Sequence, residues 1–178
     1  MIVNKCRKCS GEPWWSEIVL IKVMKSIPVQ RLNHAVLYVS DVERAAAFYE
    51  RVFGFQRIAK EGPMIFLRAK GSQNHHDLGL AGLGPKAQPA PRGSTGLYHL
   101  AWQVATIQEL ASARKTLIDE DAYTGESDHG ATKSVYGADP DGNEFEVMVL
   151  LSRDEWGAYE HEAPVRPLNW DEELQRKL

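Results

Sequence analysis

Apolar residues recur in a fixed order of strand-like and helix-like patterns from residue 32 onward. The run from Leu32 to Ser40 alternates in the way that predicts a strand. Ser40 and Glu43 match a capping box, which marks the start of a helix. Apolar residues then recur at helical spacing up to Phe53, and Gly54 ends the helix. Three short strands are predicted after it, at 55–59, 64–69 and 76–81.

The same order returns after residues 82–96, a stretch rich in Gly and Pro that predicts a linker. A strand at 97–104 contains His99, and Thr106 with Glu109 forms a second capping box. A helix follows, and then three strand candidates at 123–127, 133–136 and 144–150. His34 and His99 occupy the same place in the two copies, 99 − 34 = 65 residues apart. The chain therefore carries a duplicated module, and we expect an α+β fold of two βαβββ units.

These patterns divide the chain into three parts. Residues 1–30 form an N-terminal extension, in which Cys6 and Cys9 make a lone CxxC pair. A disulfide, a redox pair and half of a shared zinc site stay open for this pair, beside a purely peripheral role. Residues 31–151 form one domain, with module 1 at 31–81 and module 2 at 97–151. Residues 152–178 form a charged tail in which we expect one or two short helical turns.

Composition excludes several classes of partner. The chain has 178 residues, a net charge of −3 and a pI near 6.1, so we expect neither nucleic acid nor an anionic membrane as a partner. The sequence contains no apolar run of membrane-spanning length and no cleavable signal pattern. With two cysteines, a soluble cytoplasmic protein is the expected class.

The stretch from Ser127 to Met148 carries the densest chemistry. Asp139-Pro140-Asp141-Gly142-Asn143 predicts a tight turn between two strands, because Pro fixes φ and Gly or Asn tolerates positive φ. In the second strand Glu146 lies among Phe, Val and Met residues. A carboxylate there is costly to bury unless it is paired or binds a metal.

The order of residues in this stretch resembles a known signature. His129 is followed by five residues, Val135-Tyr136, two residues, Asp139-Pro140, Asp141-Gly142, three residues and Glu146. This pattern closely resembles that of the type I extradiol ring-cleavage dioxygenases, which belong to the vicinal oxygen chelate superfamily. Ser127 departs from the pattern, which usually has Gly, Asn, Thr or an aliphatic residue there. The resemblance covers residues 31–151 and implies paired βαβββ modules in one cup-shaped, incompletely closed mixed β-barrel with helices outside.

Three residues are the candidate metal ligands. A single His in a strand is more often structural than a ligand, but His34 and His99 take equivalent places and Glu146 lies in the last strand of module 2. Two imidazoles and one carboxylate form the facial triad of non-haem Fe(II) oxygenases. Three coordination positions then remain for a catechol and O2. Fe(II) is the expected metal and Mn(II) the alternative, because their ligand preferences overlap.

The resemblance also implies roles around the metal. His76 is the expected acid/base residue, His129 a hydrogen-bond donor to substrate or intermediate, and Tyr136 a contact to the substrate hydroxyl. Neighbours in a strand point to opposite faces, so we expect His76 to face the cavity and His75 to lie outside or at the rim. Catechol and O2 are the expected small-molecule partners, and a homo-oligomer is the expected assembly.

Two other functions compete with ring cleavage. Another metal-dependent member of the superfamily, such as a thiol transferase or lyase, would not need His76, His129 and Tyr136 together. A metal-free binding protein of the bleomycin-resistance kind would lack the ligand triad. Many extradiol enzymes also carry a second, metal-free pair of modules, whereas this sequence predicts a single pair. Metal analysis of freshly purified protein separates these functions.

Overall fold

The structure is a computed structural model that describes residues 26–91 and 93–175. Cys6 and Cys9 lie outside the described residues. Contacts divide the chain into two units between Asn33 and His34, and the following description concerns the second unit. Among the described residues, none of the helices has the length and apolar character needed to cross a membrane.

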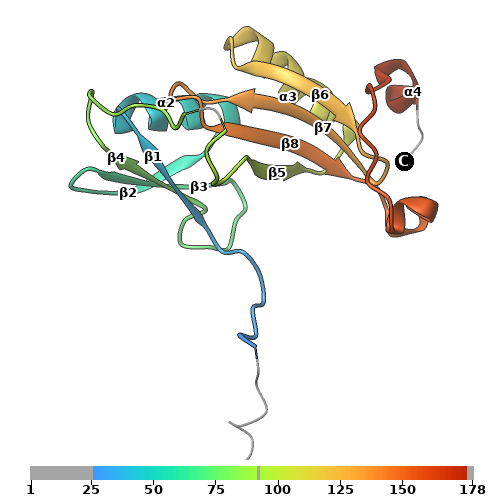
Figure 1. The fold of residues 1–178 in the computed structure, drawn as a ribbon, viewed down its shortest axis with the longest axis horizontal. Helices are drawn as coiled ribbons and strands as arrows, with labels where there is room; N and C mark the ends of the chain where they lie inside the picture. Colours follow the sequence, from blue (N-terminus) through green and yellow to red (C-terminus); the bar gives the residue numbers. More distant parts are fainter. Residues whose placement is uncertain (1–25, 92, 176–178) are drawn as a thin grey trace, which may run out of the picture. The chain divides into compact units, whose positions relative to one another are not determined.

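Module 1 forms the first of two four-stranded sheets (Figure 1). Its elements are β1 (Ala35–Val39), α2 (Val42–Phe53), β2 (Gln56–Glu61), β3 (Met64–Arg68) and β4 (Leu78–Gly82). The strands lie in the order β1-β4-β3-β2, with β1 parallel to β4 and the other pairs antiparallel.

Module 2 repeats this arrangement in the second sheet. Its elements are β5 (Leu100–Val104), α3 (Ile107–Asp119), β6 (Tyr123–Asp128), β7 (Thr132–Ala138) and β8 (Glu144–Leu150). The order is β5-β8-β7-β6, again with one parallel pair, and a register shift occurs in the second strand of each module. The α+β prediction of paired βαβββ modules is confirmed, and the two mixed sheets do not close into one.

The helix boundaries show which local signals were decisive. The Thr106 and Glu109 capping box is present at α3, and Gly54 ends α2 with a positive φ of 64°. The predicted capping box at Ser40 is wrong, because Asp41 caps α2 by accepting hydrogen bonds from the amides of Glu43 and Arg44. The Asp41 carboxylate is one residue nearer to the free amides, so the helix starts at Val42.

The strand boundaries differ from prediction at the histidines. His34 and His99 each lie one residue before a strand, and β4 begins at Leu78 rather than at His76. The physical reason for the late start of β4 is the Asp77 carboxylate. It accepts hydrogen bonds from the Ala69 amide and the Ser72 hydroxyl, which keeps the preceding residues in a loop. His75 and His76 are therefore loop residues.

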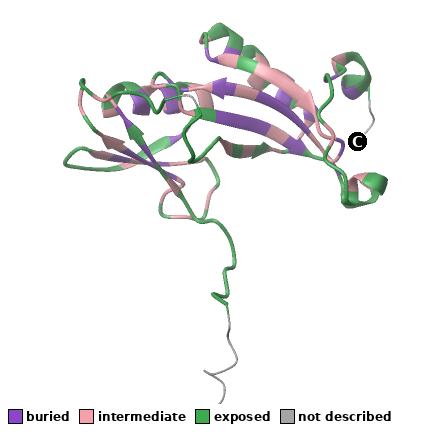
Figure 2. Cartoon of the chain, viewed as in Figure 1, coloured by how far each residue is buried: buried purple, intermediate pink, exposed green. Residues whose placement is uncertain are grey.

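A single apolar core joins the two modules. Ring contacts cross between them, with centroids 5.1 Å apart for Phe53 and Phe145 and 5.2 Å apart for Phe55 and Trp102. Figure 2 shows the buried residues concentrated on the strands and on the helix faces that cover them. Complete burial of one such aromatic side chain stabilises the fold by about 1.5–3 kcal/mol.

The Asp139–Asn143 turn is ordered by its first residue. The Asp139 side chain is 5% exposed and accepts hydrogen bonds from the amides of Asp141 and Asn143, each at 2.9 Å. It also accepts one from the Tyr49 hydroxyl of α2 at 3.3 Å. Burial, followed by the Asp139 charge, raises the pKa of Tyr49 far above its ordinary value.

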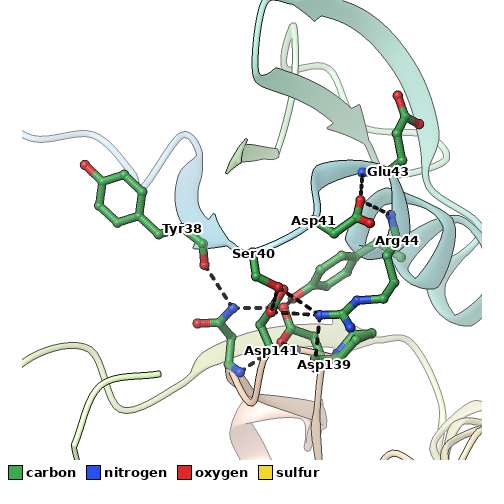
Figure 3. Close-up of polar contacts among 10 residues, drawn as sticks. Tyr38, Ser40, Asp41, Glu43, Arg44, Asp139 and Asp141 are labelled. Atoms are coloured by element: carbon green, nitrogen blue, oxygen red, sulfur yellow. Dashed lines mark hydrogen bonds and ion pairs between the residues drawn. The ribbon is translucent and has the colours of Figure 1, made fainter. Parts of the chain in front are cut away.

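The same turn fastens module 2 to module 1 (Figure 3). Asp141 accepts from the Arg44 guanidinium at 2.9 Å and from the Ser40 hydroxyl. The Asn143 side chain donates to the Tyr38 carbonyl at 3.3 Å. The Asp-Pro-Asp-Gly turn thus joins the modules, and its carboxylates are engaged in structural contacts.

The C-terminal tail follows module 2 with three short helices. These are the 3₁₀ turns η1 (Arg153–Glu155) and η2 (Gly157–Glu160) and the helix α4 (Trp170–Gln175). The sequence predicted one or two short helical turns here, and the described part of the tail contains three short helices. Between η2 and α4, Arg166 forms an isolated antiparallel bridge with Asp128 at the end of β6.

Candidate functional site

Strand pairing in module 2 gathers three of the predicted site residues. Glu146 on β8 is opposite Ala101 on β5 and opposite Tyr136 on β7. His99, two residues before Ala101, places Nε2 3.1 Å from Oε2 of Glu146. The rings of His99 and Tyr136 have centroids 5.8 Å apart. The register of the sheet, rather than proximity in sequence, brings these residues together.

The His99–Glu146 pair fits the donor chemistry of a divalent metal. Two ligand atoms about 2.1 Å from one ion and at a right angle to each other are about 3.0 Å apart, close to the 3.1 Å between Nε2 and Oε2. Glu146 is 9% exposed, so its carboxylate has little access to water. The Nδ1 atom of His99 is also buried, and within the described residues it has no hydrogen-bond partner.

Tyr136 and His129 extend this cluster. The Tyr136 hydroxyl lies 2.7 Å from Nε2 of His129, and Nδ1 of His129 lies 2.8 Å from the Pro164 carbonyl oxygen. A carbonyl only accepts, so Nδ1 carries the proton and Nε2 of the neutral ring accepts from Tyr136. The sequence analysis expected His129 to donate a hydrogen bond to substrate or intermediate. With Nδ1 bonded to the Pro164 carbonyl, donation would use Nε2 and requires the imidazolium form. Burial, then the charge of Glu146, raises the pKa of Tyr136, so the phenol keeps its proton near neutral pH.

The remaining predicted residues lie together in module 1. The His34 ring is exposed and its centroid is 4.5 Å from that of His76, which also contacts Phe66 at 4.9 Å. His76 is half-buried, whereas His75 is exposed. Burial, followed by the neighbouring His34, lowers the pKa of His76, so its ring is neutral at pH 7.

The predicted residues thus form two groups. His99, Glu146, Tyr136 and His129 make one connected cluster, and His34 with His76 makes another. Across residues 26–91 and 93–175, no group of three or more His, Cys, Asp or Glu side chains is arranged to hold a metal ion.

Two features of the site escaped the sequence analysis. The Asp77 carboxylate orders the loop that carries His76, with Asn74 and Ser72 donating to it at 2.7 Å and 2.8 Å. Ser and Asn side chains a few residues before an Asp are the available signal, because such residues bond to nearby groups in loops. No sequence pattern marks the Pro164 carbonyl as an acceptor, because every residue carries a backbone carbonyl.

Comparison with known proteins identifies relatives of two enzyme types. The chain is 33% identical to a catechol-2,3-dioxygenase of Bacillus subtilis over 126 residues, which are 70% of this chain and 43% of that protein. It is 30% identical to the metallothiol transferase FosB of Lysinibacillus sphaericus over 139 residues, which are 75% of this chain and 92% of that protein. The chain therefore spans less than half of the dioxygenase and nearly all of the transferase.

A solved structure and a family model agree on the fold. The crystal structure of a glyoxalase/dioxygenase from Nostoc punctiforme matches with a TM-score of 0.59 and 18% identity, over 72% of this chain and 99% of that one. The family model described as the glyoxalase/bleomycin resistance protein/dioxygenase superfamily matches residues 31–147. That match covers module 1 and all but the last residues of module 2, so the chain belongs to the glyoxalase/bleomycin resistance protein/dioxygenase superfamily.

Proposed function

We propose that this chain is an extradiol ring-cleaving dioxygenase, an oxidoreductase that inserts both atoms of O2 into a catechol. Its metal would be a mononuclear non-haem Fe(II), with Mn(II) as the alternative, held by His34, His99 and Glu146. Such an enzyme serves the breakdown of aromatic compounds. The 33% identity to a catechol-2,3-dioxygenase supports the choice of ring cleavage among the activities of the superfamily.

One observation carries the proposal. Tyr136, which is hydrogen-bonded to His129, lies opposite Glu146 in the module 2 sheet. Glu146 and its neighbour His99 are two of the three proposed metal ligands. A proton-handling pair beside metal donors is what a catechol needs, because its hydroxyls must lose protons before they chelate a metal. The substrate of a thiol transferase or lyase has no phenolic hydroxyl that the enzyme must deprotonate.

The protein residues handle protons around the metal. When bound, iron would supply the electron transfer that allows O2 to react with the ring. The Tyr136 oxygen accepts a hydrogen bond from the substrate hydroxyl, because its own proton is directed to Nε2 of His129. His76 is neutral at pH 7, so it can take a proton and later return it to an oxygen of the substrate.

His34 is the least constrained of the proposed ligands. It lies in module 1, whereas His99 and Glu146 lie in module 2. The proposal therefore requires His34 to reach the His99–Glu146 pair when the metal binds, from the same chain or from a second copy. Binding of Fe(II) by His34→Ala, measured by metal titration, should be at least about 10-fold weaker than in the wild type, because loss of a hydrogen-bond partner behind a ligand already costs about 10–100-fold.

The similarity to a metallothiol transferase supports a second candidate function. The chain is 30% identical to that transferase over 139 residues. Transfer of a thiol to a small electrophile such as fosfomycin would use a similar His, His and Glu set without O2. It would leave the His129–Tyr136 hydrogen bond without a catalytic use.

The two candidates are separated by one set of assays. The protein is loaded anaerobically with Fe(II) and mixed with a panel of catechols in air, and formation of the yellow ring-opened product is recorded. A parallel assay offers fosfomycin with a thiol and Mn(II). We expect product from at least one catechol, and a much slower reaction in Tyr136→Phe. Thiol transfer without ring cleavage would refute the proposal.

A further inference from the structure

We propose that the C-terminal tail, residues 152–175, is a positioning element that holds His129 in the tautomer protonated at Nδ1. This inference rests on the proposed role of His129 in the site. The tail begins after the part of the chain that matches the family model, which ends at residue 147. In Figure 1 its short helices lie at one end of the module 2 sheet.

The main chain of the tail is aligned with the residue that precedes His129. Asp128 and Arg166 exchange two backbone hydrogen bonds, of 2.8 Å and 3.0 Å, as one antiparallel bridge. This bridge adds to the free edge of the sheet at the last residue of β6. Two residues before Arg166, the Pro164 carbonyl oxygen meets Nδ1 of His129 at 2.8 Å. This sheet contact is one of the interactions that place the acceptor for His129.

A buried ion group anchors the same region. Lys133 is 4% exposed, and its ammonium lies 2.5 Å from Oδ1 of Asp128 and 3.2 Å from Oε1 of Glu173. Glu173 belongs to α4 and is 6% exposed. Removing one partner of a buried ion pair leaves an uncompensated charge, so these contacts oppose detachment of the tail.

An aromatic ring covers the turn that carries His129. Gly130 has a φ of +80°, and a Cβ atom there would lie 2.5 Å from ring carbons of Tyr159. The Arg166 guanidinium lies 5.3 Å from the centroid of this ring and donates to the Tyr159 hydroxyl at 2.9 Å. Tyr159 therefore packs directly on the backbone next to His129 and is itself held by Arg166.

The tautomer determines the direction of the Tyr136 hydrogen bond. With the proton on Nδ1, Nε2 is an acceptor and the Tyr136 hydroxyl points its proton toward it. A substrate hydroxyl can then pass its proton to the Tyr136 oxygen while Tyr136 passes its own to Nε2. The substrate becomes an anion, Tyr136 is unchanged and His129 becomes an imidazolium. With the proton on Nε2 instead, His129 could not accept, and this transfer would stop.

The tautomer can be measured without any assay of activity. In full-length protein labelled with ¹⁵N-histidine, long-range ¹H–¹⁵N spectra distinguish a protonated Nδ1 from a protonated Nε2, and His129→Gln assigns the signal. We expect the Nδ1-protonated pattern in the wild type. Tyr159→Ala and Arg166→Ala should lose it, and turnover of a catechol should fall by about 100-fold, the lower end for a positioned acid/base group.

Two matched variants separate positioning from general stability. Tyr159→Phe keeps the ring over Gly130, so it should retain the wild-type tautomer. Arg153→Ala removes an exposed ion pair with Glu160 in the same tail and should also leave the His129 signal unchanged. Arg166 is exposed, so Arg166→Ala keeps the apolar core intact if Tyr159→Ala fails to fold.

The outcomes are distinct for the two proposals. An unchanged Nδ1-protonated signal in Arg166→Ala and in folded Tyr159→Ala would overturn the role of the tail, whatever the activity. A shifted tautomer in a protein that cleaves no catechol would support the role of the tail and refute ring cleavage. A wild-type signal protonated at Nε2 would overturn the inference directly.

Discussion

The two modules share their strand order but use the connection between their last two strands differently. In module 1 this connection is the long segment 69–77, and in module 2 it is the tight turn between β7 and β8. One aspartate organises each connection, Asp77 in the first and Asp139 in the second. The long loop presents His75 and His76, whereas the turn contacts the other module.

The difference shows how a duplicated scaffold divides its tasks. A loop whose backbone is held by an internal carboxylate can expose imidazoles without losing its shape. A short turn has few free side chains, and its carboxylates are engaged in joining the modules. The two histidines at equivalent places differ in burial. His34 is exposed beside His76, whereas the His99 side chain is 25% exposed and lies beside the buried Glu146. Module 2 therefore holds the better protected half of the proposed site.

The largest expected effect follows from removing the carboxylate of module 2. Glu146→Ala should abolish retention of Fe(II), measured as metal content after desalting, and with it the ring-cleaving activity. Circular dichroism should show the fold retained. Glu144 is exposed on the same strand and face, so Glu144→Ala should keep both metal and activity. Normal metal content in Glu146→Ala would contradict the assignment of this ligand.

The second prediction tests the loop of module 1. His76→Gln should slow turnover by roughly 10²–10⁴-fold, the usual range for a positioned acid/base. Fe(II) content and catechol binding should persist, because no proposed ligand is removed. The matched change His75→Gln should be nearly silent, because His75 is exposed. If His75→Gln is the damaging change instead, the roles assigned to the two histidines are reversed.

The third prediction tests the turn of module 2. Asp139→Ala should lower the free energy of unfolding by about 3 kcal/mol, because it leaves the Tyr49 hydroxyl and two turn amides without their acceptor. Urea denaturation measures this loss. Asp119 is exposed in an i,i+4 pair with Lys115, so Asp119→Ala should change stability by less than about 0.5 kcal/mol. Equal losses in both variants would contradict the structural role of the turn.

The last prediction concerns how the free energy of unfolding depends on pH at the end of module 2. Burial by itself would raise the pKa of Asp128. Lys133, the Gly130 amide and Arg166 stabilise the carboxylate, so the pKa lies below its ordinary value of 3.8. Because the pKa of Asp128 is lower in the folded than in the unfolded protein, its ionised carboxylate stabilises the fold. This stabilisation is complete above pH 3.8 and is lost as the pH falls through the pKa of the folded protein. Asp128→Asn should therefore be less stable than the wild type at pH 7, with a difference that shrinks in acid. Asp154→Asn, an exposed change in the tail, should change the free energy of unfolding at pH 7 by less than about 0.5 kcal/mol.

The sequence alone predicted the parts of the fold that depend on neighbours along the chain. The order of elements, the Thr106 capping box, the Gly54 helix end and the Asp139–Asn143 turn all follow from contacts within a few residues. The start of α2 was predicted one residue early, because two adjacent residues, Ser40 and Asp41, can both cap a helix. The start of β4 was misplaced because the Asp77 side chain competes with strand formation.

The candidate site depended on contacts that no local pattern contains. The signature identified His129, Tyr136 and Glu146 as a set, but only the pairing of β7 with β8 puts Tyr136 opposite Glu146. The proton position on His129 depends on the Pro164 carbonyl, 35 residues further along the chain. Backbone groups are present at every residue, so only tertiary structure decides which of them meets a given side chain.

The sequence by itself therefore determined the duplicated modules, the tight turn and the residue types available for chemistry. Tertiary structure decided which of these residues are in contact, placing His99 against Glu146 and His34 against His76. It also decided that the turn of module 2 fastens the modules together. The physical reason is range, since capping and turn formation act over a few residues whereas sheet register and burial act between segments far apart in the chain.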